Sequence, residues 1–347
     1  MRLLCLNLCL FVLVLLGCGG QIESGKWHSD SQLIQGGETV PIEQFPWQVA
    51  IYSENRFTEQ LKLKCGGSII DQQWVLTSVS CANKAVWFSR LWVLAGSNQA
   101  DAQGKNSDPQ SQWREVSESY NHPKFSVINN LTNALLPLKR SPIQNLNDLA
   151  LLRLAQPLDF ETDNVNKIVL ATKEDQSSEL FEEGTFAWIS GYGLVKEIAE
   201  EDPDTLLAAS LPIISNQQAE EHFETHHKEL EESEHGACTD FPRRMSPGQI
   251  ATGATQIQIK EQLFPSPLYP DLTFSPFYGD ALGPLVVLDL ERNQFILVGI
   301  VSYALMERSN GISYAKAPQV YTRVSFYESC LSNPENFPES FLDCEIE

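Results

Sequence analysis

The chain has 347 residues, 42% of them hydrophobic, which is enough for one large β domain or two small ones. Its formal net charge of −21 disfavours nucleic acid and anionic lipid, because their phosphates carry the same sign of charge. We therefore expect neither a nucleic acid partner nor a membrane partner, and an acidic surface that either attracts cationic partners or serves solubility alone.

The N-terminal residues have the order of a secretory signal. Arg2 precedes an apolar run from Leu3 to Leu16, which is followed by small residues, and the run is too short to span a bilayer comfortably. A signal peptide is predicted at residues 1–20 and a short pro-segment at 21–33, so we expect a secreted, extracellular protein. The Leu-Leu-Gly-Cys end of the run also fits a bacterial lipoprotein box, and that alternative stays open.

Short runs rich in Val, Ile, Leu and aromatic residues, separated by turn residues, predict β-strands. Their regular spacing indicates an antiparallel sandwich or barrel without deciding which. The predicted strands are Gln48–Tyr52, Gly67–Ile70, Trp74–Thr77, Leu91–Ala95, Leu149–Leu154, Phe186–Ser190, Leu285–Leu288, Phe295–Tyr303 and Val320–Val324.

Other segments depart from this pattern. Gln99–Gln112 is polar and predicts a mobile surface insertion, and Lys196–Asp204 predicts a charged loop. Asn130 begins the sequence Asn-Leu-Thr, which predicts a glycosylated surface loop.

Gln217–Glu234 predicts an exposed helix, since it is rich in Glu, His and Ala and lacks Gly and Pro. His222 and His226 lie on one face of that helix, a spacing that can bind a divalent metal. We expect a solvated acidic face and no metal there, and no cofactor elsewhere.

An ordered series of motifs resembles the trypsin/chymotrypsin family of serine proteases, the peptidase S1 domain, from Ile34 to about Cys330. The resemblance implies an all-β fold, a trypsin-like double six-stranded antiparallel β-barrel. Its domain is expected at 34–330, with halves of about 34–155 and 156–330 and a C-terminal tail at 331–347. The motifs are Ile34–Gly37, Phe45–Val49, Cys65–Cys81, Asn147–Leu152, Trp188–Gly193, Gly279–Pro284, Gly299–Tyr303 and Pro318–Val324.

Two of the three catalytic positions that the resemblance implies hold other residues. Ser80 stands where the family has its histidine base, and Ala281 stands where it has its serine nucleophile, whereas Asp148 matches the aspartate. Alanine has no atom that attacks a carbonyl, and a hydroxyl does not accept a proton near neutral pH as imidazole does.

These replacements predict that the chain is no enzyme but a secreted, inactive serine protease homologue that acts by binding an unknown secreted protein. Two rival functions remain open. One is a divergent serine-type endopeptidase with a non-standard site, and the other is an acidic metal-binding secreted protein.

The resemblance also assigns the specificity-pocket positions to Ser275, Ser302, Tyr303 and Gln319. In the family the hydroxyl that corresponds to Ser302 is hydrogen-bonded to the catalytic aspartate. Gln319 replaces a glycine, so its long polar side chain is expected to fill part of the pocket.

Activation in the family joins a new N-terminal isoleucine to the aspartate before the nucleophile, which here are Ile34 and Asp280. Leu33 rather than Arg or Lys precedes Ile34, so a trypsin-like activator is not expected to cut there. Asp280 is either a working latch or a relict.

An oxidising compartment allows disulfides. The resemblance implies a Cys65–Cys81 disulfide, and Cys330 and Cys344 are candidates for closing a C-terminal loop. Cys238 is then left over, as a partner for Cys18 or as a bridge in a disulfide-linked dimer.

Overall fold

The computed structural model describes residues 38–83, 89–102, 109–127, 145–192, 205–232, 244–253, 283–303, 306–309, 312–315 and 318–344. All of them belong to the second of two units of the chain, Ser31–Glu347. The predicted signal peptide at 1–20 and pro-segment at 21–33 lie outside the described residues. In the described part, no helix is both long enough and apolar enough to cross a membrane.

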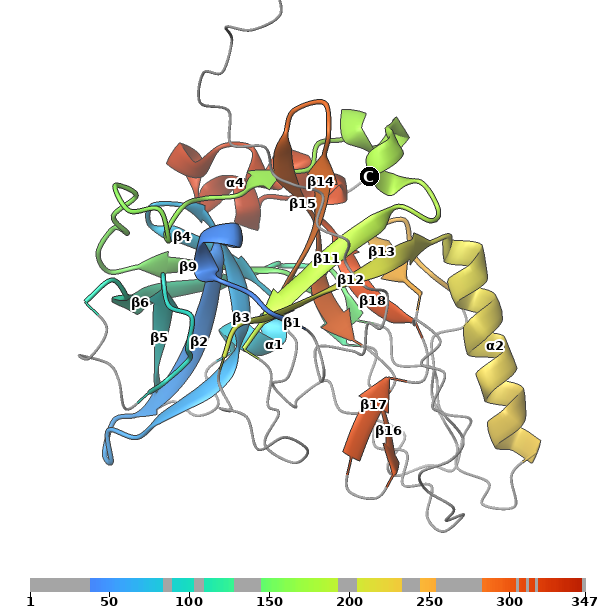
Figure 1. Ribbon diagram of the computed structural model, residues 1–347, viewed down its shortest axis with the longest axis horizontal. Coiled ribbons are helices and arrows are strands. Elements are labelled where there is room, and N and C mark those ends of the chain that lie inside the picture. Colours follow the sequence, from blue (N-terminus) through green and yellow to red (C-terminus); the bar gives the residue numbers. More distant parts are fainter. Residues whose placement is uncertain are drawn as a thin grey trace, which may run out of the picture. The chain divides into compact units, whose positions relative to one another are not determined.

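Six antiparallel strands close the first barrel (Figure 1). Its interior is apolar: Val49, Leu91 and Leu151 are fully buried. Closure pairs β2 with β5, so these strands present no free edge. In spatial order they are β2 (Gln48–Asn55), β3 (Leu61–Asp71), β4 (Trp74–Thr77), β9 (Ala150–Leu154), β6 (Gln112–Asn121) and β5 (Ser89–Ala95).

A second ring of six antiparallel strands closes through the pairing of Ile213 with Thr252. The double six-stranded barrel expected from the resemblance is therefore confirmed. The ring contains β12 (Leu207–Ile214), β11 (Phe186–Gly191), β14 (Pro284–Asp289), β15 (Gln294–Tyr303), β18 (Gln319–Arg323) and β13 (Gln249–Thr252).

Smaller elements flank the barrels. β1 (Glu38–Thr39) extends the second sheet beside β12, and β10 (Val169–Leu170) runs parallel to β15. Two separate ladders are β7 (Ser126–Val127) with β8 (Asn145–Leu146) and β16 (Met306–Ser309) with β17 (Ile312–Ala315). The described helices are η1 (Ile42–Gln44), α1 (Val79–Ala82), η3 (Glu174–Ser177), η4 (Glu179–Phe181), α2 (Asn216–Glu232), η5 (Val324–Tyr327), α3 (Glu328–Leu331), η6 (Pro334–Asn336) and α4 (Glu339–Leu342).

All predicted strands overlap observed ones, and the predicted helix corresponds to α2. Three barrel strands, β6, β12 and β13, were not predicted from sequence. The predicted insertion 99–112 ends in β6, because Gln112 already pairs with Ala95. The predicted loop Lys196–Asp204 lies outside the described residues.

Aromatic side chains join the two barrels. Phe295 of β15 lies 5.9 Å from Phe45 and 5.4 Å from Trp47, measured between ring centroids. Nearby, the Ser190 hydroxyl of β11 donates a 2.7 Å hydrogen bond to the Gln48 side chain of β2. The barrels are thus connected by both apolar packing and a buried polar contact.

Residues 331–344, expected as a tail, pack on the first barrel. Phe341 is fully buried, and the Phe337 ring lies edge-on to Trp74 at 5.1 Å. A Cys330–Cys344 disulfide closes the segment. The first hydrophobic core therefore includes side chains from the end of the described chain.

Candidate functional site

Asp148 lies at the junction of the two barrels, just before β9, and is only 1% exposed to solvent. One carboxylate oxygen accepts the backbone N–H of Val79 at 2.9 Å, and the other accepts the Ser302 hydroxyl at 2.7 Å. The Thr322 hydroxyl donates to the backbone carbonyl of Asp148 at 2.9 Å. Asp148 is therefore held by both barrels at once.

Burial raises the pKa of Asp148 to about 6, because a carboxylate loses its hydration there. The hydrogen bonds from the Ser302 hydroxyl and from the backbone N–H groups of Val79 and Ser80 oppose this rise. These neutral donors only partly offset the cost of burying the charge.

Ser80 lies on α1, and its half-buried hydroxyl is 2.9 Å from that of Ser78. Ser78 is the N-cap of this helix, whose last turn is held by a Cys65–Cys81 disulfide. α1 thus has a fixed position relative to Asp148, since Val79 on the same turn donates to the carboxylate.

Lys64 of β3 also fixes α1. Its ammonium group donates to the carbonyl of Cys81 at 2.8 Å and to that of Asn83. These carbonyls lack helical partners, and a cation near a helix C-terminus is favourable. Burial lowers the pKa of Lys64 to about 8.

His122 does not supply the imidazole that is missing at Ser80. Its ring packs edge-on against Tyr327 at 5.4 Å and Phe341 at 5.7 Å, and its Nδ1 accepts the backbone N–H of Lys124. Burial, with a smaller effect of Lys124, lowers the pKa of His122 to about 4. It is a neutral core histidine.

Ser302 and Tyr303, two of the predicted pocket positions, have different surroundings. Ser302 reaches Asp148, whereas Tyr303 lies with Phe223 and Val320 in a hydrophobic cluster beneath α2 and is 4% exposed. Burial raises the pKa of Tyr303. Tyr303 therefore contributes to the core.

Gln319 is buried, and its side-chain oxygen accepts the Tyr321 hydroxyl at 2.6 Å. The same hydroxyl is 3.2 Å from that of Thr252 on β13. This chain of contacts fixes the orientation of the Gln319 carboxamide.

Sequence reasoning did not single out Tyr321, Thr322 or Thr252. Tyr321 and Thr322 lie in the motif Pro318–Val324, so their proximity in sequence to Gln319 was the available signal. Thr252 comes close only because β13 pairs with β18, which no local pattern indicates.

Five predicted site residues lie outside the described residues: Ile34, Asn130, Ser275, Asp280 and Ala281. The same holds for Cys18 and Cys238. In the described part of the chain, no three His, Cys, Asp or Glu side chains form a group that could hold a metal, and His222 is exposed.

Comparison with known proteins identifies relatives of this fold. The sequence matches the trypsin family over residues 34–249. It is 34% identical to mouse Kallikrein-1 over 55% of this chain and 64% of the relative, and 29% identical to mouse Kallikrein 1-related peptidase b11 over 53% and 60%. It is 32% identical to rat Prostatic glandular kallikrein-6 over 61% of this chain and 69% of the relative. The chain spans less than two thirds of the length of the first two relatives.

The expectation that the chain is not an enzyme is contradicted by these relatives, which are kallikreins, one of them named a peptidase. That inference relied on residue types at Ser80 and Ala281, and Ala281 lies outside the described residues. Two aligned side chains do not establish which groups meet in space. The match over residues 34–249 and the closed double barrel show that the chain belongs to the trypsin family.

Proposed function

We propose that this chain is a secreted trypsin-family protein that binds a polypeptide segment at the junction of its barrels. The 2.7 Å hydrogen bond from the buried Ser302 hydroxyl to the buried Asp148 carboxylate carries the proposal, because it fixes the end of β15 relative to the connection that precedes β9. Fixed donors and acceptors lower the ordering cost of binding.

Gln319 suggests which side chain of the ligand is preferred. Its carboxamide oxygen accepts the Tyr321 hydroxyl, so its NH2 group is the part of the side chain that can donate to a ligand. A nitrogen with two N–H donors at a pocket position favours a short ligand side chain that accepts hydrogen bonds. It disfavours Lys and Arg, which are donors only.

Peptide hydrolysis is the second candidate function, and the kallikrein relatives favour it. Kallikrein 1-related peptidase b11 is named for that activity. In this chain the buried Asp148 carboxylate has the Ser302 hydroxyl and the backbone N–H of Ser80 as hydrogen-bond donors.

Secretion is supported by the predicted signal at 1–20 and by the two disulfides, Cys65–Cys81 and Cys330–Cys344. Disulfides persist in oxidising compartments. We also propose that Ile34 and Asp280 form the activation contact of the family. Mutation of Asp280 tests this contact.

Two modifications are part of the proposal and have direct tests. Glycosylation at Asn130 predicts a smaller apparent mass after glycosidase treatment. A dimer bridged by Cys238 predicts a double-mass band on a non-reducing gel that Cys238→Ser removes.

Peptide capture tests the binding function. The purified chain is incubated with a mixture of casein peptides, and retained peptides are identified by mass spectrometry. The proposal expects a defined retained set that Gln319→Ala changes. The matched control is Gln176→Ala, because Gln176 likewise makes one side-chain hydrogen bond, to Ser325 at 3.1 Å.

No retained peptides, or the same set after Gln319→Ala, would refute binding at this junction. Intact casein and a fluorophosphonate probe decide the second candidate in parallel. Casein cleavage together with covalent labelling of the chain supports hydrolysis, and the absence of both removes that candidate.

A further inference from the structure

We propose that the end of the second barrel opposite Asp148 is a docking surface for a basic polypeptide segment with apolar side chains. Its apolar part consists of Phe186, Leu288 and Leu290, which we call the Leu290 surface. Leu290 is 83% exposed and Phe186 is 62% exposed. Large apolar side chains that gather on a surface indicate an interaction site.

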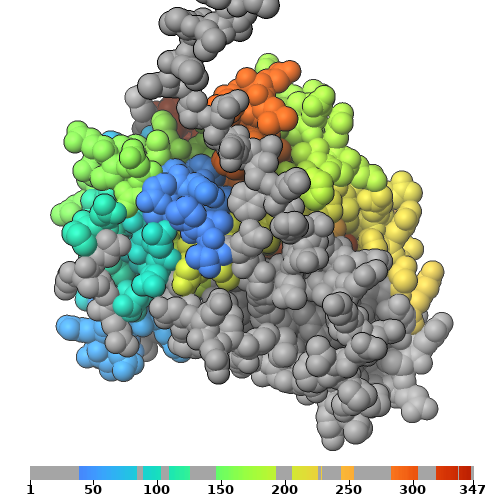
Figure 2. Space-filling view, in the orientation of Figure 1, coloured from blue at the N-terminus to red at the C-terminus, as the bar shows by residue number. Residues whose placement is uncertain are grey.

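The register of the sheet brings these side chains together. Ala187 pairs with Val287, and both are buried inside the barrel. Side chains alternate along a strand, so Phe186 and Leu288 are opposite one another on the outer face. Leu290 follows in the β14–β15 turn, and in Figure 2 this hairpin (orange) lies beside the η3–η4 segment (green).

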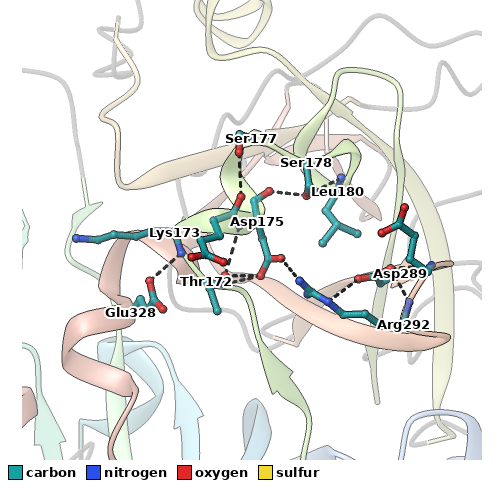
Figure 3. Close-up of polar contacts among 11 residues, drawn as sticks. Thr172, Lys173, Asp175, Ser177, Ser178, Leu180, Asp289, Arg292 and Glu328 are labelled. Carbon is teal, nitrogen blue, oxygen red and sulfur yellow. Dashed lines mark hydrogen bonds and ion pairs between the residues drawn. The ribbon is translucent and has the colours of Figure 1, made fainter.

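Ion pairs and hydrogen bonds of Asp175 and Asp289 hold the turn that carries Leu290 (Figure 3). Arg292 forms ion pairs with Asp175 at 2.8 Å and with Asp289 at 3.3 Å. Asp289 also accepts the backbone N–H groups of Glu291 and Arg292 at 2.9 and 3.0 Å. A preorganised turn loses little conformational entropy when a partner binds.

Hydrogen bonds from Thr172 fix the Asp175 carboxylate. Its carboxylate accepts the backbone N–H and the hydroxyl of Thr172 at 2.7 and 2.8 Å (Figure 3). The charge of Arg292 is therefore matched by two carboxylates and leaves no net positive charge for an anionic partner.

Exposed acidic residues flank the apolar residues along the chain. Exposed Glu179, Glu182 and Glu183 precede Phe186 in the chain, and exposed Glu291 follows Leu290. Together with the formal net charge of −21, they favour Lys and Arg around the anchoring side chain of a partner. Charge complementarity thus selects a basic, apolar protein segment.

The Leu290 surface is distinct from the proposed junction site. Phe295, beside Leu288, lies near the start of β15, whereas Ser302 lies near its end. Seven residues of strand separate them by roughly 23 Å. The two proposals can therefore fail independently.

The experiment measures binding of a short fluorescein-labelled peptide of alternating lysine and leucine, by fluorescence anisotropy with the full chain. Phe186→Ser/Leu290→Ser is expected to weaken binding about tenfold, because both anchors are lost. Phe57→Ser is the matched control, since Phe57 is 77% exposed in the β2–β3 turn, and it is expected to change binding less than about twofold.

Separate variants test the contribution of charge to peptide binding. Glu182→Gln/Glu183→Gln is expected to weaken binding and to reduce its dependence on salt, whereas Glu161→Gln, an exposed carboxylate elsewhere, has little effect. A peptide of alternating glutamate and leucine is expected not to bind.

Equal weakening by the Phe57 and Phe186/Leu290 variants would overturn the proposal, as would unchanged binding in both. Circular dichroism and thermal midpoints show whether each variant is folded. A dimer in sedimentation that Phe186→Ser/Leu290→Ser dissociates would also overturn it, because a second copy would then cover the surface.

Discussion

Replacing Asp148 with asparagine is expected to alter how the free energy of unfolding depends on pH. Burial raises the pKa of this carboxyl group from its ordinary 3.8 to about 6. The folded protein therefore binds the proton more tightly than the unfolded chain does. Its free energy of unfolding rises as pH falls through 6, and this gain is lost again as pH rises.

The size of the effect follows from the shift. About two pKa units at 1.36 kcal/mol each give roughly 3 kcal/mol over the whole range. Between pH 7 and pH 5 the linkage relation gives about 1.3 kcal/mol. Asparagine is neutral at every pH, so the Asp148→Asn variant lacks this contribution.

The assay is urea unfolding of the oxidised protein at pH 7 and pH 5, with wild type and variant compared at each pH. The difference between them removes contributions from the many other carboxylates. The stability of wild type relative to Asp148→Asn is expected to increase by about 1.3 kcal/mol on going to pH 5.

Asp175→Asn is the matched control. Asp175 is also a buried acceptor of backbone and hydroxyl donors, but it has Arg292 as a cation partner. Burial alone would raise the pKa of Asp175, but hydrogen bonds from Thr172 and Arg292 outweigh it and lower that pKa. Its effect on stability should be constant from pH 7 to pH 5. A flat difference for Asp148→Asn as well would refute the burial argument.

Three further predictions concern other sites. Gly283→Ala should lower the free energy of unfolding by about 3 kcal/mol in urea, because the new Cβ would lie 1.8 Å from the Ser190 carbonyl oxygen; an unchanged midpoint would contradict this contact. Arg292→Ala should lower the urea midpoint at pH 7, because it removes the ion pair with Asp175. This effect should become smaller in acid, as the pH falls through the lowered pKa of Asp175 and the carboxylate loses its charge. His122→Gln should reduce the loss of stability between pH 6.5 and 4. The folded protein keeps His122 neutral down to a pKa of about 4, whereas the unfolded chain already binds the proton in this range. An unaltered pH profile of the free energy of unfolding would argue against burial of that ring.

Part of the fold follows from local sequence. Strands such as β4 and β15 are rich in β-branched and aromatic residues and have turn residues at their ends, so they were predictable. β6 is polar along much of its length, and β12 contains Ala and Pro, which are uncommon in strands. These strands exist because neighbouring strands supply their hydrogen-bond partners.

The candidate site, too, was predictable from sequence only in part. The motif order placed Asp148 and Ser302 among the important residues, but Tyr303 was assigned to a pocket and lies in the core. The hydrogen bond of Gln319 with Tyr321 depends on strand geometry, which the residue types do not show. The conclusion against enzyme activity failed because it used residue identity at two positions without relatives or geometry.

The sequence by itself determined the family, the order of the principal strands and the position of Asp148, since these depend on local patterns and motifs. Only the tertiary structure decided the closure of both rings, the burial that raises the Asp148 pKa, and the exposure of Phe186 and Leu290. Burial and pairing arise between residues far apart in the chain, so no local pattern encodes them.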